Sequence, residues 1–147
     1  MKLLAIALAV FSLAALAGCR EQATVTSEAK SLTLKAPHDV TIIRGETAKL
    51  TIELVRENFA DPVKIKFGNL PDAVKVVGAG GTTVAIGPVH VDIGHEPPAI
   101  TGDRETYTLE AGADAPLVSD TKVLVSAKGP DDKPVTVSFA LTVKAKP

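Results

Sequence analysis

Apolar side chains recur at every second position through most of the chain after residue 30, and this alternation constrains the fold more than any other feature. A β-strand turns successive side chains to opposite faces, so a period of two indicates a sheet with one buried face. The longest run places Val135, Val137, Phe139, Leu141 and Val143 on one side. Shorter runs lie at 50–54, 63–67, 74–76, 89–93, 107–111 and 123–127. No segment there has the 3.6-residue period of an amphipathic helix, so the pattern predicts an all-β fold.

Turn-forming residues separate these runs. Arg44-Gly45-Glu46 precedes one alternating segment, the glycine-rich stretch 78–81 follows another, and Gly129-Pro130-Asp131-Asp132 precedes the last. Glycine supplies positive φ and proline fixes φ, which is why both punctuate strands. The alternating runs and the turns between them therefore predict that residues 31–147 form an antiparallel β-sandwich of about seven to nine strands.

The first nineteen residues have the anatomy of an export signal. Met1-Lys2 is a short positive region, 3–15 is apolar apart from one serine, and Leu16-Ala17-Gly18-Cys19 follows. This ending resembles the lipobox of bacterial lipoproteins, which implies cleavage between Gly18 and Cys19 and a covalent lipid on the Cys19 thiol. The apolar run is shorter than the roughly 20 residues that a membrane-spanning helix needs. An ordinary signal peptide does not require a cysteine at this position.

The lipoprotein resemblance also bears on location. In enteric-type sorting an aspartate after the lipidated cysteine favours inner-membrane retention, and this chain has Arg20 there. We therefore expect an envelope protein, with the outer membrane favoured if the cell has one. Whether it faces the periplasm or the exterior stays open. Residues 19–30 are polar without a sustained apolar face, so the expected domains are a signal peptide at 1–18, a flexible tether at 19–30 and one folded domain at 31–147.

Charge and cysteine content exclude several classes of protein. Without the signal, 15 basic residues remain against 17 acidic ones, a net charge of about −2 for the mature chain. A nucleic-acid binder needs a basic field to neutralise phosphates, so we expect no nucleic-acid partner. The one cysteine is the predicted lipid site, so the folded domain has no disulfide.

A second resemblance lies within the strands. Arg56 precedes Phe59 and Pro62-Val63, and Asn69-Leu70-Pro71-Asp72-Ala73-Val74 follows. These segments resemble immunoglobulin-like modules of bacterial exported and cell-surface proteins, which often have an arginine, an aromatic and Pro-Val at a strand start, then a Leu-Pro-x-Gly-Val turn. Ala73 replaces the usual glycine, and the paired cysteines and buried tryptophan of immunoglobulins are absent. The resemblance spans residues 40–143 and implies a spacer, docking or accessory module.

The residues with most potential for chemistry lie between 90 and 96. His90 and Asp92 share one face of an alternating run, and His95 and Glu96 follow Gly94. Two imidazoles and carboxylates could bind zinc or copper, but their spacing matches no established motif and an exposed strand face explains them better. No metal is therefore predicted, with His90, Asp92, His95 and Glu96 as weak candidates.

No catalytic apparatus is evident. The chain has no Gly-x-Ser-x-Gly elbow and no phosphate-binding glycine loop followed by Lys-Ser or Lys-Thr. We expect no enzyme and no cofactor beyond the lipid on Cys19. The leading hypothesis is a lipid-anchored module that docks an envelope protein partner or supports the envelope, with β-augmentation at a sheet edge as one docking mode. The alternative is a metal-binding lipoprotein that uses His90, Asp92 and His95.

Overall fold

A computed structural model describes residues 20–78, 81, 83–87 and 100–147. This part of the chain forms ten strands and one 3₁₀ turn: β1 (Gln22–Ser27), β2 (Lys30–Lys35), β3 (Val40–Ile43), β4 (Thr47–Glu57), β5 (Ile65–Gly68), β6 (Val74–Val77), β7 (Thr83–Ile86), β8 (Arg104–Ala111), β9 (Val118–Lys128), η2 (Pro130–Asp132) and β10 (Pro134–Lys144). The prediction of an all-β fold is confirmed. None of the described residues belongs to a helix with the length and apolar character needed to cross a bilayer.

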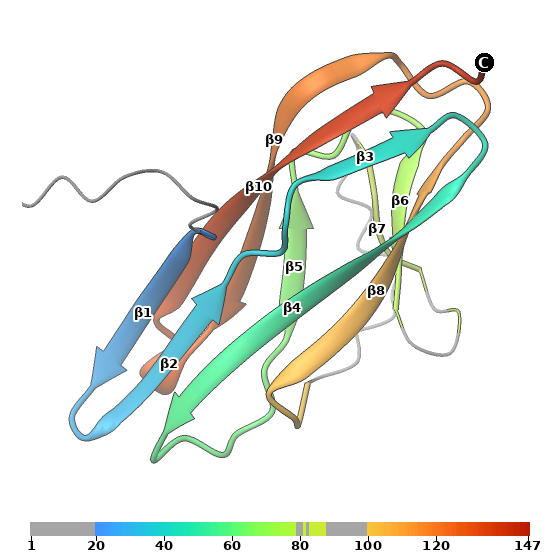
Figure 1. The fold of residues 1–147 in the computed structure, drawn as a ribbon. Helices are drawn as coiled ribbons and strands as arrows, with labels where there is room; N and C mark the ends of the chain where they lie inside the picture. Colours follow the sequence, from blue (N-terminus) through green and yellow to red (C-terminus); the bar gives the residue numbers. More distant parts are fainter. Residues whose placement is uncertain (1–19, 79–80, 82, 88–99) are drawn as a thin grey trace, which may run out of the picture.

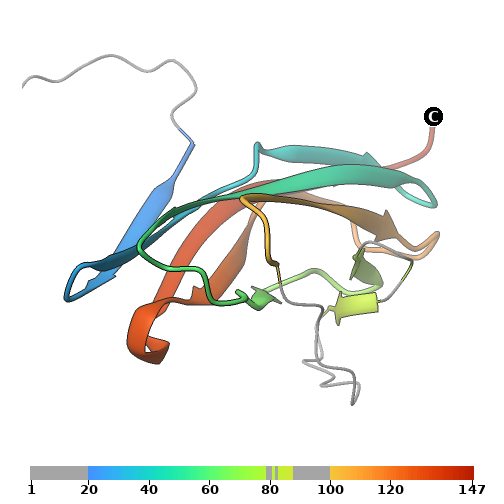
Figure 2. The ribbon, with the colours of Figure 1, turned by 90° about the horizontal axis from the view of Figure 1, so that it is seen from below.

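The strands form two sheets that pack face to face (Figure 1; Figure 2). The six-stranded sheet has the order β1-β2-β4-β8-β6-β7, and the four-stranded sheet has the order β3-β10-β9-β5. The chain changes sheets after β2, because residues 36–39 lead from β2 in the larger sheet to β3 in the smaller one.

This order is that of an immunoglobulin-like sandwich. Such domains place strands A, B, E and D in one sheet and C, F and G in the other. Here β2, β4, β8 and β6 correspond to the first set, and β5, β9 and β10 to the second. β1 and β7 extend the larger sheet at its two edges, and β3 adds a strand beside β10. The predicted sandwich and its immunoglobulin-like class are therefore confirmed.

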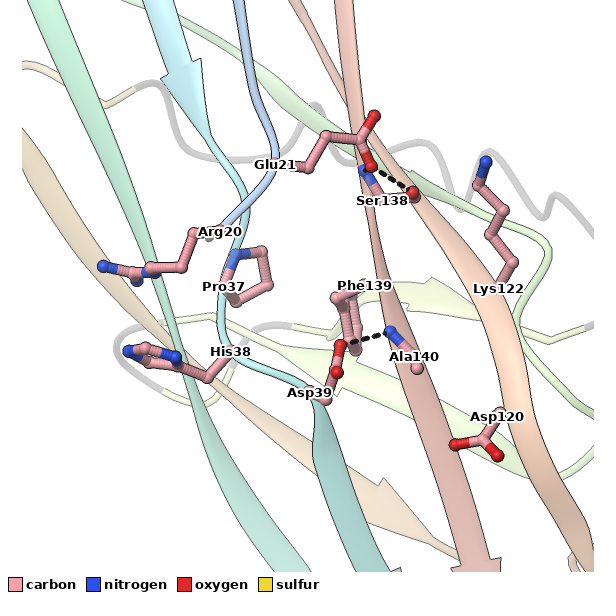
Figure 3. Close-up of a pocket in the computed structure, with 10 residues that line it drawn as sticks. All are labelled: Arg20, Glu21, Pro37, His38, Asp39, Asp120, Lys122, Ser138, Phe139 and Ala140. Atoms are coloured by element: carbon pink, nitrogen blue, oxygen red, sulfur yellow. Dashed lines mark hydrogen bonds between the residues drawn. The ribbon is translucent and has the colours of Figure 1, made fainter. Parts of the chain in front are cut away.

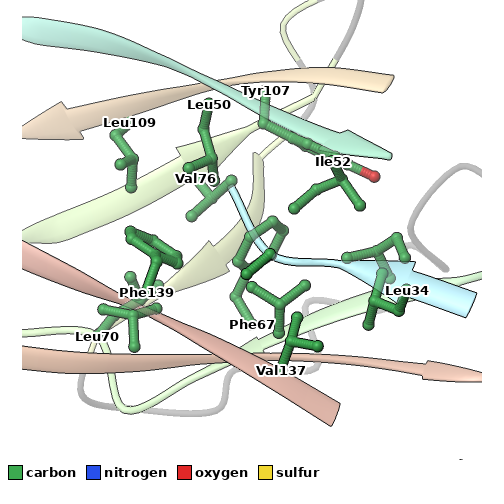
Figure 4. Close-up of a cluster of buried hydrophobic side chains, with 14 of the residues drawn as sticks. Leu34, Leu50, Ile52, Phe67, Leu70, Val76, Tyr107, Leu109, Val137 and Phe139 are labelled. Carbon is green, nitrogen blue, oxygen red and sulfur yellow. The ribbon is translucent and has the colours of Figure 1, made fainter. Parts of the chain in front are cut away.

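The core lies between the sheets and is built from the predicted alternating residues (Figure 4). Phe67 of β5 and Tyr107 of β8 meet edge to face, with ring centroids 5.2 Å apart and planes at 75°. This aromatic pair joins the two sheets, and such contacts add about 0.5–1.5 kcal/mol beyond their buried area. Burial, together with the negative charge of Glu105, raises the pKa of Tyr107 well above its usual value.

Two details of the sandwich differ from the prediction. The described chain has ten strands rather than seven to nine. In addition, β3 pairs in parallel with the end of β10, with Val40 opposite Leu141 and Ile43 opposite Lys144, so the sheets are not wholly antiparallel. The parallel pair arises because the chain crosses between sheets directly before β3 and continues in the same direction.

The predicted flexible tether at 19–30 is wrong for its described part. β1 covers Gln22–Ser27 and pairs antiparallel with β2 along its whole length. The pairing continues beyond the strand, because the Ala36 N–H donates to the Glu21 carbonyl at 2.7 Å. Residues 19–30 lack long apolar side chains, yet β1 needs few of them, because it lies at a sheet edge with only Ala23, Val25 and Ser27 turned toward the body of the protein. The folded domain thus includes Arg20 onward rather than residue 31 onward.

The turns between strands explain two sequence features. Gly45 has φ of +75°, as expected for the predicted turn between β3 and β4. Ala73, which stands where the resembling modules have glycine, keeps the left-handed backbone with φ of +54°. The alanine Cβ is therefore held in a backbone conformation that disfavours L-residues.

Candidate functional site at the N-terminal junction

Arg20, the residue that follows the predicted lipid site, is fixed to the folded domain. Its Nε donates to the Ala36 carbonyl at 3.0 Å, and its Nη1 lies 3.3 Å from Glu53 Oε2 on β4. Only 24% of the Arg20 side chain is exposed. The folded domain therefore begins one residue after Cys19, without an intervening linker.

Glu53 is shared between two arginines. Its other oxygen, Oε1, accepts a hydrogen bond from Arg104 Nη2 at 2.6 Å. Partial burial works against the charged carboxylate, but the charges of Arg20 and Arg104 and their hydrogen bonds outweigh it and hold the pKa of Glu53 below its usual value. The Glu53 side chain is 20% exposed, so this network is partly shielded from water.

A hollow of about 360 Å³ lies beside Arg20, where the chain crosses between sheets (Figure 3). Residues 20–21 and 37–39 form one wall, and residues of the paired strands β9 and β10 form the other. A second hollow of about 340 Å³ lies across the same crossover and shares Arg20, Pro37, His38 and Asp39 with the first. These two depressions surround the start of the folded chain.

Carboxylates in the first hollow bind one backbone edge of β10 (Figure 3). Glu21 Oε2 accepts the Ser138 N–H at 3.1 Å and also the Ser138 hydroxyl. Asp39 Oδ1 accepts the Ala140 N–H at 2.8 Å. β3 pairs with β10 only from Leu141 onward, so these carboxylates occupy donors that the neighbouring strand leaves unpaired. Charged side chains of this kind protect a sheet edge from pairing with another chain.

The described residues of this hollow form a structural rather than a nucleophilic arrangement. The Ser138 hydroxyl donates to Glu21 and not to His38, and the Asp39 carboxylate is bound to backbone. The Glu21 oxygen that accepts the Ser138 hydroxyl also accepts the Ser138 N–H, so this carboxylate ties the strand to the N-terminal segment. His38 and Asp39 are both exposed, and Asp39 is held in place by its hydrogen bond to β10.

Arg56, singled out by the resemblance, ties two loops to β4. Its guanidinium donates to three backbone carbonyls: Asp61 at 2.6 Å, Ile100 at 2.9 Å and Gly102 at 3.1 Å. Its Nε lies 3.7 Å from Asp103 Oδ1, and only 9% of the side chain is exposed. Arg56 therefore has a structural role, because its planar guanidinium group joins β4 to Ile100, which lies 44 residues further along the chain.

The remaining predicted site residues lie outside the described part of the chain. These are Gly18 and Cys19 at the predicted cleavage and lipidation site, and His90, Asp92, His95 and Glu96 of the metal hypothesis. Both assignments stay predictions. Elsewhere in the described ranges, no group of three or more His, Cys, Asp or Glu side chains is placed to hold a metal ion.

Comparison with known proteins supports the fold and goes no further. No protein-family model matches the chain, and no curated protein matches its sequence. Among solved structures, a conjugative transposon lipoprotein from Bacteroides eggerthii is similar, with a TM-score of 0.52 and 11% identity over 78% of this chain and 98% of that one. A chimeric titin Z1Z2 protein has a TM-score of 0.40 and 18% identity over 78% of this chain and 95% of that one. The titin M3 domain has a TM-score of 0.39 and 14% identity over 74% of this chain and 91% of that one.

Proposed function

We propose that this chain is a non-enzymatic, lipid-anchored envelope protein whose immunoglobulin-like domain is held directly at the membrane surface. The observation that carries the proposal is the fixed position of Arg20, which follows the lipobox cysteine and is bound to both Ala36 and Glu53. In a lipoprotein without a linker, the cysteine that ends the export signal directly precedes the folded domain. Cys19 and Arg20 have this relationship in the sequence.

The function of such a domain follows from what its described surface offers. The carboxylates in the hollow beside Arg20 are engaged by β10, since Glu21 binds the N–H and hydroxyl of Ser138 and Asp39 binds the N–H of Ala140. We therefore assign the domain a docking or supporting role in the envelope rather than catalysis.

The protected edge of β10 limits how a protein partner could dock. Glu21 and Asp39 already bind the N–H groups of Ser138 and Ala140, so strand addition there would first have to displace both carboxylates. Docking by β-augmentation is better suited to β5, the edge strand at the other side of the four-stranded sheet.

The lipid anchor can be tested on the full chain expressed in a bacterial host. We expect the protein to partition into the detergent phase of a Triton X-114 extract, and its N-terminal peptide to begin at Cys19 with a diacylglyceryl mass. Cys19→Ala removes the thiol and is expected to leave a precursor without lipid. An N-terminus other than Cys19, or a mature protein without lipid, would contradict the proposal.

The docking role needs a separate measurement. Crosslinking of the lipidated protein in cells, followed by mass spectrometry, is expected to give one stoichiometric envelope partner. Recovery of abundant neighbours in proportion to their amounts would contradict docking and favour a supporting role.

A further inference from the structure

A single stretch of backbone joins the predicted lipid site to the folded domain. Arg20 follows Cys19, and Glu21 begins the pairing with the segment after β2, because its carbonyl accepts the Ala36 N–H at 2.7 Å. Hydrolysis of the Arg20–Glu21 bond would therefore separate the whole domain from its lipid. Trypsin-type proteases cut after arginine, because their specificity pocket holds a carboxylate that binds the guanidinium. By residue type, the bond through which the domain is anchored is thus a protease site.

In the folded protein the Arg20 guanidinium is already bound. Its Nε donates to the Ala36 carbonyl at 3.0 Å, and its Nη1 lies 3.3 Å from Glu53 Oε2 on β4. Glu53 thereby offers the arginine the same kind of group, a carboxylate, that a trypsin-type pocket offers. One guanidinium cannot enter such a pocket while it holds both partners. A protease that binds Arg20 must first break both contacts.

The residue on the other side of the bond is held as well (Figure 3). Glu21 Oε2 accepts the Ser138 N–H at 3.1 Å and also the Ser138 hydroxyl on β10. Arg20 and Glu21, together with their partners Ala36, Glu53 and Ser138, are termed the Arg20 latch. The latch fixes both sides of the Arg20–Glu21 bond to three separate segments of the chain.

The latch can open without unfolding of the core. Glu21 is exposed, and Arg20 lines both of the hollows that flank the crossover between the sheets. The contacts of the latch lie before β1, which begins at Gln22, so the strand ladder does not have to separate along its length. Chain ends commonly open locally at a small fraction of the global free energy of unfolding. The latch therefore has a closed and an open state within one folded domain.

We infer that Arg20–Glu21 is a cleavage site for a trypsin-type protease and that the Arg20 latch controls access to it. The closed latch keeps the domain on its membrane, and the open latch lets a protease bind Arg20. Water then adds across the amide bond. Arg20 keeps the new carboxylate and stays with the lipid, and Glu21 begins the released domain with a free α-amino group. The inference rests on the proposed lipid anchor, and it adds a route by which the domain leaves the membrane.

The test uses lipidated full-length protein in phosphatidylcholine vesicles, treated with trypsin. Sedimentation separates the released domain from the vesicles, and mass spectrometry identifies its N-terminus. We expect the parent protein to release slowly a domain that begins at Glu21. Arg20→Lys should release it about fivefold faster, because lysine keeps a trypsin site but lacks the fork that binds Ala36 and Glu53 together. Loss of one partly exposed ion pair changes an open population by about that factor.

Matched controls separate the latch from other effects on the rate. Peptides of residues 19–27, with and without the Arg20→Lys change, correct for the preference of trypsin between the two side chains. Glu53→Gln removes the carboxylate that binds Arg20 and is expected to give a similar increase. Arg104→Gln removes the other partner of Glu53 and is expected to leave release at the parent rate. Cleavage after Lys30, directly after the turn between β1 and β2, is the internal reference and should be the same in all variants.

Three outcomes have distinct meanings. Equal release of the parent, Arg20→Lys and Glu53→Gln would overturn the inference, because the rate would not depend on the latch. A failure of all three to yield a domain that begins at Glu21 would overturn it as well, since the bond would not be a cleavage site. Protein that does not sediment with the vesicles before trypsin is added would instead contradict the lipid anchor itself.

Discussion

The carboxylate of Asp39 accepts the backbone N–H of Ala140 at 2.8 Å, across 101 residues of sequence. Glu21 binds Ser138 in the same way two residues earlier on β10. The two carboxylates accept backbone N–H groups of β10 that the carbonyls of a neighbouring strand would otherwise accept. Neither Ser138 nor Ala140 is left with a free N–H donor.

Removal of both acids should make the protein associate with itself. Glu21→Ala with Asp39→Ala exposes the N–H groups of Ser138 and Ala140, and unpaired strand edges are templates for intermolecular pairing. We expect concentration-dependent dimers in analytical ultracentrifugation at concentrations where the parent domain is monomeric. Asp61→Ala, which removes an exposed carboxylate elsewhere, serves as the control. A double variant as monodisperse as the control would contradict a protective role.

Arg56 should contribute far more to stability than Arg104. Replacement of Arg56 by lysine removes the fork that reaches the carbonyls of Asp61, Ile100 and Gly102, of which the bond to Ile100 is partly buried. We expect a loss of about 2 kcal/mol in the free energy of unfolding, as for hydrogen bonds to a charged group, measured from urea denaturation. Arg104→Lys is the matched control, since its side chain is 69% exposed and its ion pair contributes about 1 kcal/mol or less. Equal losses in both variants would show that the loop contacts are not stabilising.

Ala73→Gly should stabilise the protein. Ala73 holds φ of +54°, a conformation that costs an L-residue about 1 kcal/mol and glycine almost nothing. The urea midpoint is therefore expected to rise. Ala48→Gly in the extended backbone of β4 is expected to lower it, because there the glycine only adds unfolded-state entropy. If the midpoint fell in both variants, the positive φ of Ala73 would not be what destabilises the parent protein.

Glu53 should make stability depend on pH in acid. Its folded pKa lies below the ordinary value of 4.5, so its contribution is complete above that value and is lost as the pH falls through the lower folded pKa. Glu53→Gln should therefore destabilise the protein at pH 7, and the difference from the parent should shrink as the pH falls below 4.5. In an Arg104→Gln background the effect should be smaller, since one of the two attracting cations is gone. A difference that is independent of pH would contradict the coupling.

The alternating pattern predicted the sandwich because burial of one face follows directly from strand geometry. The runs that include Leu50, Phe67, Tyr107 and Val125 all form buried strand faces. β1 escaped detection because an edge strand is held mainly by its backbone ladder to β2, and hydrogen bonds between backbone groups leave no signature in side-chain type.

The junction around Arg20 could be predicted only in part. The lipobox drew attention to Arg20 as a sorting residue, yet its contacts with Ala36 and Glu53 depend on how the sheets bring distant segments together. Glu21 and Asp39 looked like ordinary surface acids, because nothing local indicates that β10 lies beside them.

The position of β10 between β3 and β9 has a consequence for the order in which the four-stranded sheet can assemble. β10 follows both neighbouring strands in the chain, so it can join them only after residues 134–144 have been made. Until it arrives, β3 has no neighbour in the four-stranded sheet and β9 lacks one of its two, and Glu21 has no donor to bind. The four-stranded sheet therefore closes only when β10 is in place, and the binding of its N–H groups by Glu21 and Asp39 belongs to that last step of assembly.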